Sequence, residues 1–222
     1  MEPTDIPKPE REEKRAGAAS KLFVGLLLAG PLLALAGYLA WQRQLRGTEF
    51  PVISEVHDFS LTNQAGQHVA LGDLRGKTWV ADVIFTRCPG PCAMMTRTMA
   101  DLQKRLPRGA NVALVSLTAD PEFDTPAVLS RYAARFGADL NSWQFLTGDK
   151  QQIYRLALDD LKLAVAPDDS PEARAQGNLF VHSTKFMVVD REGKVRAYFD
   201  GAEPGAAGLA AKAIRQLAKQ NR

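Results

Sequence analysis

The chain has 222 residues, 45% of them hydrophobic and 24% charged, which suits one ordinary globular domain with an additional segment. Its net charge is only +3 and no basic stripe with interleaved aromatic residues is present, which argues against a nucleic-acid-binding protein. Two cysteines cannot form the disulfide framework of a small secreted protein.

The N-terminal 21 residues are polar, and their five basic and five acidic side chains cancel in charge. Prolines at positions 3, 7 and 9 add to this composition. We predict a disordered tail over residues 1–21. Its acidic residues argue against a mitochondrial transit peptide.

Residues 22–41 contain no charged residue and, as a helix, would extend about 30 Å, the thickness of a membrane's hydrocarbon core. Pro31 is tolerable within such a span, and Tyr38 and Trp41 suit its interfacial end. We predict a single uncleaved transmembrane helix. A cleaved signal peptide is the alternative, but the small-x-small site at residues 34–36 falls inside the apolar run.

Basic residues flank this span on both sides, with a slight excess before it: Lys14, Arg15 and Lys21 against Arg43 and Arg46. The bias favours a cytoplasmic N-terminus. The expected location is the bacterial inner (cytoplasmic) membrane, with the soluble domain facing the periplasm. That compartment is oxidising, so a free dithiol there needs a reason to stay reduced.

A linker over 42–56 leads into a predicted domain over 57–222, in which strands and helices alternate. The expected elements are a hairpin over 59–71, strands over 79–85, 112–119 and 143–148, helices over 92–106, 127–136, 151–158 and 205–220, a polar loop over 166–178, and a second hairpin over 179–199. Thr125 is the expected N-cap of the helix over 127–136. The order predicts an α/β, thioredoxin-like domain with a central mixed sheet and an inserted β-hairpin, preceded by one transmembrane helix.

Both cysteines, Cys88 and Cys92, lie between the apolar strand over 79–85 and the helix that follows. A helix N-terminus favours thiolate over thiol. Three residues, Pro89-Gly90-Pro91, separate the cysteines, whereas thioredoxin-type redox sites have two. The wider loop lets both sulfurs face one guest atom and does not exclude a disulfide, so metal binding and redox exchange both remain open. A purely structural disulfide across so short a loop would stabilise the chain little.

Two thiolates are soft ligands that suit Cu(I) or Zn(II), and a third ligand is then wanted. The three histidines are His57, His68 and His182. His57 and His68 have polar neighbours and are predicted to lie at the surface. His182 lies in an apolar stretch, where a histidine is by default a satisfied buried residue rather than a ligand.

Five spaced motifs occur in order: Phe85-Thr86-x-Cys88-Pro89-x-x-Cys92, Asp120-Pro121-x-x-Asp124-Thr125-Pro126, Leu146-Thr147-Gly148, Val181-His182-Ser183 and Val189-Asp190-x-x-Gly193. Together they resemble the Sco/SenC family of membrane-anchored copper-binding proteins, which help to assemble the Cu(A) centre of cytochrome c oxidase. The resemblance covers about residues 57–200 and includes the N-terminal span. It departs from the family at Ala93, where a proline usually follows the second cysteine.

The resemblance implies a thioredoxin-like domain that binds one copper ion, Cu(I) or Cu(II), through Cys88, Cys92 and His182. The implied partners are the Cu(A)-bearing oxidase subunit and another copper chaperone. Two functions stay open: a copper metallochaperone, or a thiol–disulfide oxidoreductase with Cys88 and Cys92 as its redox pair that reduces the Cu(A)-site cysteines. A peroxiredoxin-type peroxidase is a distant third.

Four residues near the motif have open roles. Met94 or Met95 could add a thioether contact to a metal, although the helical spacing of Met95 is more typical of a core residue. Asp120 and Asp124 follow the strand over 112–119, on the side of the thiols. We interpret them as carboxylates that stabilise a turn and a helix start locally, with a role near the cysteine loop as the alternative.

Overall fold

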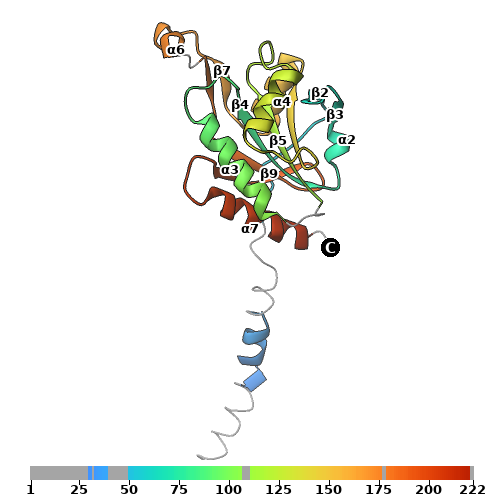
Figure 1. The fold of residues 1–222 in the computed structure, drawn as a ribbon. Helices are drawn as coiled ribbons and strands as arrows, with labels where there is room; N and C mark the ends of the chain where they lie inside the picture. The colour runs from blue at the N-terminus through green and yellow to red at the C-terminus, as the bar shows by residue number, and fades with distance from the viewer. Residues whose placement is uncertain (1–29, 32, 40–49, 107–110, 177–178, 221–222) are drawn as a thin grey trace, which may run out of the picture. The chain divides into compact units, whose positions relative to one another are not determined.

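The computed structural model describes residues 30–31, 33–39, 50–106, 111–176 and 179–220 (Figure 1). The chain forms two compact units, residues 1–49 and 50–222. In the first unit, residues 30–31 and 33–39 are helical. Within the described ranges, no helix has the length and apolar character needed to cross a membrane, so the structure gives the predicted span over 22–41 no support. The predicted tail over 1–21 and residues 22–29 and 40–49 lie outside the description.

In the described part of the second unit, a mixed sheet runs in the order β1-β10-β9-β4-β5-β6-β2-β3. Its strands are β1 (Ser54–Glu55), β2 (Ser60–Asn63), β3 (His68–Ala70), β4 (Thr78–Ile84), β5 (Val112–Thr118), β6 (Trp143–Thr147), β9 (Lys185–Val189) and β10 (Lys194–Asp200). Strands β4, β5 and β6 are parallel, and the remaining pairings are antiparallel. The α/β domain with a central mixed sheet is confirmed, as are the first predicted hairpin and the part of the second that pairs β9 with β10.

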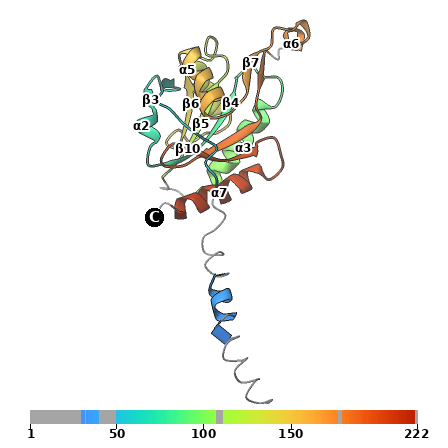
Figure 2. The same cartoon turned by 180° about the vertical axis from the view of Figure 1, so that it is seen from behind.

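The central strand β4 is buried along its whole length, as its nearly continuous apolar sequence predicted. Helices cover the sheet: α2 (Leu71–Leu74), α3 (Cys92–Arg105), α4 (Pro126–Arg135), α5 (Lys150–Arg155) and α7 (Ala206–Gln220). Helix α3 packs against α7, and the two lie side by side in both views (Figures 1 and 2). The buried side chains of α3 include Met95, Met99 and Leu102, so its apolar stripe faces the core.

Three predicted boundaries are wrong. The segment over 166–178 is not a plain loop, because it contains most of β7 (Val165–Pro167) and the short helix α6 (Pro171–Gln176). The first arm of the second hairpin is split into β8 (Phe180–His182) and β9, because β8 leaves the main sheet and pairs with β7. Residue Ile53 donates to the Val195 carbonyl (2.8 Å) beside β1, so the sheet begins within the predicted linker over 42–56.

A π-helical turn, η1 (Leu156–Asp160), continues α5 beyond the predicted helix over 151–158. Its last residue, Asp160, is buried and accepts hydrogen bonds from the His57 backbone N–H (3.1 Å) and from Arg155 (2.9 Å). The His57 contact holds the start of the domain against η1.

Candidate metal site

Three segments that are distant in sequence bring Cys88, Cys92 and His182 together. Cys88 lies in the loop after β4, Cys92 is the first residue of α3, and His182 ends β8. The His182 Nε2 atom lies 3.1 Å from Cys92 Sγ and 3.9 Å from Cys88 Sγ. All three atoms lie within 4.8 Å of one another, which is close enough for one metal ion to contact all of them.

Local structure explains where the two sulfurs lie. Strand β4 ends at Ile84, and the Cys88 backbone N–H donates to the Phe85 carbonyl (3.2 Å), which turns the chain at the carboxyl edge of the sheet. The Gly90 N–H points at Cys88 Sγ (3.4 Å). Helix α3 begins directly at Cys92, whose side chain is 1% exposed, whereas Cys88 is half-buried. One thiol therefore belongs to the core, and the other can be reached from solvent.

The His182 ring is oriented by its backbone and by a neighbouring aromatic side chain. Its Nδ1 lies 3.1 Å from the Ser183 carbonyl oxygen, a contact that requires Nδ1–H to donate, so in the neutral ring the Nε2 lone pair faces the sulfurs. The ring of Phe85 meets the imidazole edge-on, with centroids 5.7 Å apart. The other two histidines, His57 and His68, are exposed, as their polar neighbours predicted.

The two thiols have opposite protonation tendencies. The hydrogen bond from Cys92 lowers the pKa of Cys88 to about 4, and the His182 contact acts in the same direction against the effect of burial. The same bond, together with burial, raises the pKa of Cys92. Burial lowers the pKa of His182, but its contacts with Cys88 and the Ser183 carbonyl outweigh this and raise it. Near neutral pH the pair is one thiolate and one thiol, and a metal that binds both sulfurs must displace the Cys92 proton.

A buried carboxylate beneath this site escaped the sequence analysis. Asp82 lies within β4, is 0% exposed, and neither of its oxygens has a hydrogen-bond partner among the described residues. Burial raises the pKa of Asp82 to about 7, opposed in part by the nearby Ser116 side chain and then by the charge of His182. The signal was present in the sequence: a single acidic residue interrupts an apolar strand that ends just before the cysteine loop.

The carboxylates of Asp120 and Asp124 contact the cysteine loop, which corrects the preference for purely local roles. Asp124 accepts hydrogen bonds from the backbone N–H and the hydroxyl of Thr86, and Asp120 forms an ion pair with Arg87. Among the methionines, Met95 is buried in the core, as its spacing indicated. Met94 is exposed.

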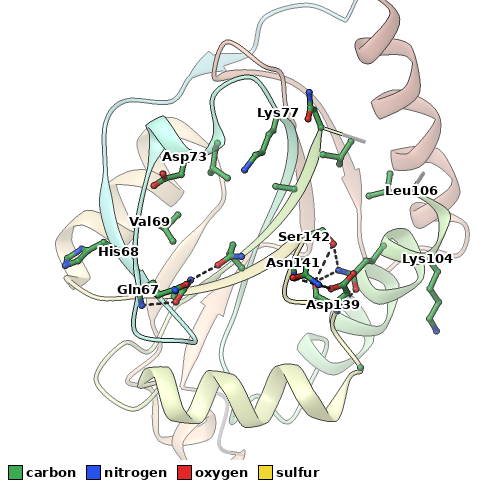
Figure 3. Close-up of a pocket in the computed structure, with 18 residues that line it drawn as sticks. Gln67, His68, Val69, Asp73, Lys77, Lys104, Leu106, Asp139, Asn141 and Ser142 are labelled. Atoms are coloured by element: carbon green, nitrogen blue, oxygen red, sulfur yellow. Dashed lines mark hydrogen bonds between the residues drawn. The ribbon is translucent and has the colours of Figure 1, made fainter. Parts of the chain in front are cut away.

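A groove of about 1000 Å³ lies away from this site (Figure 3). It is lined by residues at the amino ends of the parallel strands, including Lys77, Val112 and Ser142, whereas the cysteines lie at the carboxyl ends. Its polar side chains bind one another: Asn63 donates to Gln144 (2.8 Å), for example. The chemistry-bearing groups therefore lie outside this groove.

The SCO1/SenC family model matches residues 51–219. The chain belongs to the SCO1/SenC family. A SCO1 protein homolog of Bacillus subtilis is 38% identical over 155 residues, 69% of this chain and 77% of that protein. BsSco, a member of the Sco family of cytochrome c oxidase assembly proteins in which a disulfide switch was identified, is 32% identical over 76% of this chain and 96% of BsSco, with a TM-score of 0.65. The copper-bound ScoI of Bradyrhizobium japonicum shares the fold at 22% identity, with a TM-score of 0.62 over 74% of this chain and 99% of ScoI.

Proposed function

We propose that this Sco-family protein takes up one copper ion at Cys88, Cys92 and His182 and delivers it during assembly of the Cu(A) centre of cytochrome c oxidase. The observation that carries the proposal is the convergence of two sulfurs and one imidazole nitrogen within 4.8 Å. Such a soft donor set suits Cu(I). Membership of a family whose relative BsSco is a cytochrome c oxidase assembly protein supports the assignment.

The exposure of the site suits delivery better than storage. Cys92 is buried, but Cys88 is half-buried and lies on a loop, so an incoming ligand can approach the metal from that side. The expected recipient is the Cu(A)-bearing oxidase subunit, and the expected donor is another copper chaperone. Copper is here a cargo that moves by ligand exchange, and no substrate is turned over.

The proposed location is the bacterial inner membrane, with residues 22–41 as the anchor and residues 50–222 on the periplasmic side. The support is the uncharged stretch of 20 residues and the basic residues that precede it. Protease treatment of spheroplasts tests the orientation: the domain should be digested from outside. Protection of the domain in intact spheroplasts would contradict the proposal.

A Cu(I) titration of the reduced full chain in detergent tests the copper site. We expect one equivalent to bind, with a large loss of affinity in Cys88→Ser and His182→Ala. The matched control is His68→Ala, because His68 is exposed and lies outside the site. If wild type does not bind one equivalent of Cu(I), or if His182→Ala binds Cu(I) as tightly as wild type, the copper proposal is wrong.

A second candidate, reduction of the Cu(A)-site disulfide, is favoured by the asymmetry of the two thiols. The Cys88 thiolate would attack the partner's disulfide and form a mixed disulfide. Cys92 would then lose its proton and attack the Cys88 sulfur, which releases the partner as a dithiol and leaves a Cys88–Cys92 disulfide. This reaction does not need His182. Complementation of a deletion strain separates the two: retained oxidase assembly in His182→Ala, with loss in Cys88→Ser, would favour the reductase.

A further inference from the structure

The turn after β5 holds both residues that directly precede Cys88. The buried carboxylate of Asp124 accepts from the Thr86 backbone N–H (3.1 Å) and from the Thr86 hydroxyl. The next residue, Arg87, forms an ion pair with Asp120 on the same turn. The cysteine loop is therefore bound to residues more than 30 positions later in the chain.

The end of the sheet explains why Thr86 needs this partner. The β4–β5 ladder ends at the pair Ile84–Thr118, and the Ala119 N–H makes the last bond, to the Ile84 carbonyl (2.8 Å). Beyond that point the Thr86 N–H has no opposing strand. The Asp124 carboxylate, 0% exposed, accepts that N–H and so continues the pairing past the ends of both strands.

The turn that presents Asp124 is itself fixed. The Thr118 hydroxyl donates to Asp124 and accepts from the Asp120 backbone N–H (3.0 Å). The Asp124 backbone N–H donates to the Asp120 carbonyl (2.8 Å). Because the carboxylate is bound to the end of β5 and to its own turn, it cannot follow the cysteine loop if that loop shifts.

Arg87 provides a second attachment at the surface. Its guanidinium lies 3.8 Å from the centroid of the Phe123 ring and pairs with Asp120, whose side chain is 8% exposed. The turn after β5 thus holds Thr86 on its buried side, through Asp124, and Arg87 on its outer side, through Asp120. Together they restrict where the next residue, Cys88, can place its sulfur.

We propose that residues 118–124 position the Cys88 sulfur for metal capture, with Asp124 as the main positioning residue. This inference rests on the proposed copper site. Cys92 and His182 are placed by α3 and β8, whereas Cys88 lies on a loop whose two preceding residues are held by the side chains of Asp124 and Asp120. Loss of such supporting partners typically lowers metal affinity about 10–100-fold.

The test compares Cu(I) affinities of the reduced full chain with Thr86→Val and its matched control, Thr98→Val. Both substitutions remove one hydroxyl at nearly constant volume, but the Thr98 hydroxyl donates to the Met94 carbonyl within its own helix, α3 (3.1 Å). We expect about a 10-fold loss of affinity in Thr86→Val and none in Thr98→Val. Arg87→Ala should also weaken binding, and because Arg87 is partly exposed this variant should fold.

Asp124 itself is tested by a pair of variants. Asp124→Ala should lower Cu(I) affinity about 100-fold. Asp124→Asn should restore it, because the amide oxygen can accept from the Thr86 N–H while the amide nitrogen donates to the Thr86 hydroxyl. If Asp124→Ala does not fold, Thr86→Val and Arg87→Ala decide the question. A purely structural role would lower the melting temperature without this pattern in the affinities.

A copper-free measurement separates this inference from the proposed function. The reduction potential of the Cys88–Cys92 pair should differ from wild type in Thr86→Val and not in Thr98→Val. If wild type binds no Cu(I), the copper proposal fails and the reduction potential alone decides the positioning role. Wild-type affinity and wild-type potential in both Thr86→Val and Asp124→Ala would overturn it.

Discussion

Replacing Asp82 with asparagine should remove a stability cost that grows in wild type as pH rises from about 4 to about 7. The carboxyl is completely buried, and its pKa rises from 3.8 to about 7 on folding. Between these values the folded state keeps the Asp82 proton and the unfolded state has lost it. The stability contributed by Asp82 therefore falls as pH rises through this window, and the full cost is present above about pH 7.

The magnitude follows from the size of the shift. Three pKa units correspond to about 4 kcal/mol at roughly 1.4 kcal/mol per unit, an upper bound for the ionised carboxylate. The amide of Asp82→Asn is never charged, but its N–H groups still need partners. That cost is the same at every pH, and only about two of the three units lie between pH 5 and pH 7. We therefore expect the stability of the variant relative to wild type to rise by about 2–3 kcal/mol from pH 5 to pH 8.

Urea unfolding of residues 50–222, reduced, at pH 5 and pH 8 measures this gain as a difference between two proteins. Other groups near Asp82 also titrate. His182, with a raised pKa, contributes stability that is lost as pH rises, and Cys88, with a lowered pKa, contributes stability that is lost as pH falls. The parts of these titrations that do not involve Asp82 cancel between wild type and variant, so the difference reports Asp82 together with its coupling to His182. Asp58→Asn, at an exposed position, is the control. An equal difference at both pH values would refute the reasoning.

Two further predictions concern packing and thiol reactivity. A Cβ at Gly201 would lie 2.4 Å from the Phe186 ring, so Gly201→Ala should destabilise the domain by about 1–3 kcal/mol. Gly208 lies in α7 with open space around it, so Gly208→Ala should be neutral or stabilising. Equal melting temperatures for the two variants would contradict this prediction. Since the pKa of Cys88 is about 4, the rate of its alkylation by iodoacetamide should be nearly independent of pH from 6 to 8. The Cys92→Ala variant lacks the main cause of the lowered pKa, so its alkylation rate should rise with pH.

The helices and strands that were predicted best are those marked by a long hydrophobic pattern within a single segment of the sequence. The apolar run at β4 and the stripe at Met95, Met99 and Leu102 each identify one element without outside information. The cap at Thr125 is confirmed, because its hydroxyl accepts from the Val128 N–H (3.4 Å). The two-stranded sheet of β7 and β8 was not predicted, because each strand has only three residues and is defined by its pairing with the other strand.

The candidate site was predictable in part for the same reason. Cys88 and Cys92 stand in one loop, so spacing alone singled them out. The histidine that faces them lies 90 residues beyond Cys92, and only the family resemblance marked His182 as a ligand. Asp82 and Asp124 owe their roles to burial and to contacts across the sheet edge, which no local pattern reports.

The order in which the ligands are buried bears on how the cargo would leave. Cys92 is anchored at the start of α3, and the Ser183 carbonyl fixes the His182 ring, whereas Cys88 is half-buried and held through its two preceding neighbours. A partner's thiolate would therefore reach the metal most easily beside Cys88. The turn over 118–124 must hold this sulfur firmly enough for capture, while its exposure leaves room for exchange. We infer that capture depends on all three ligands and that release begins at Cys88.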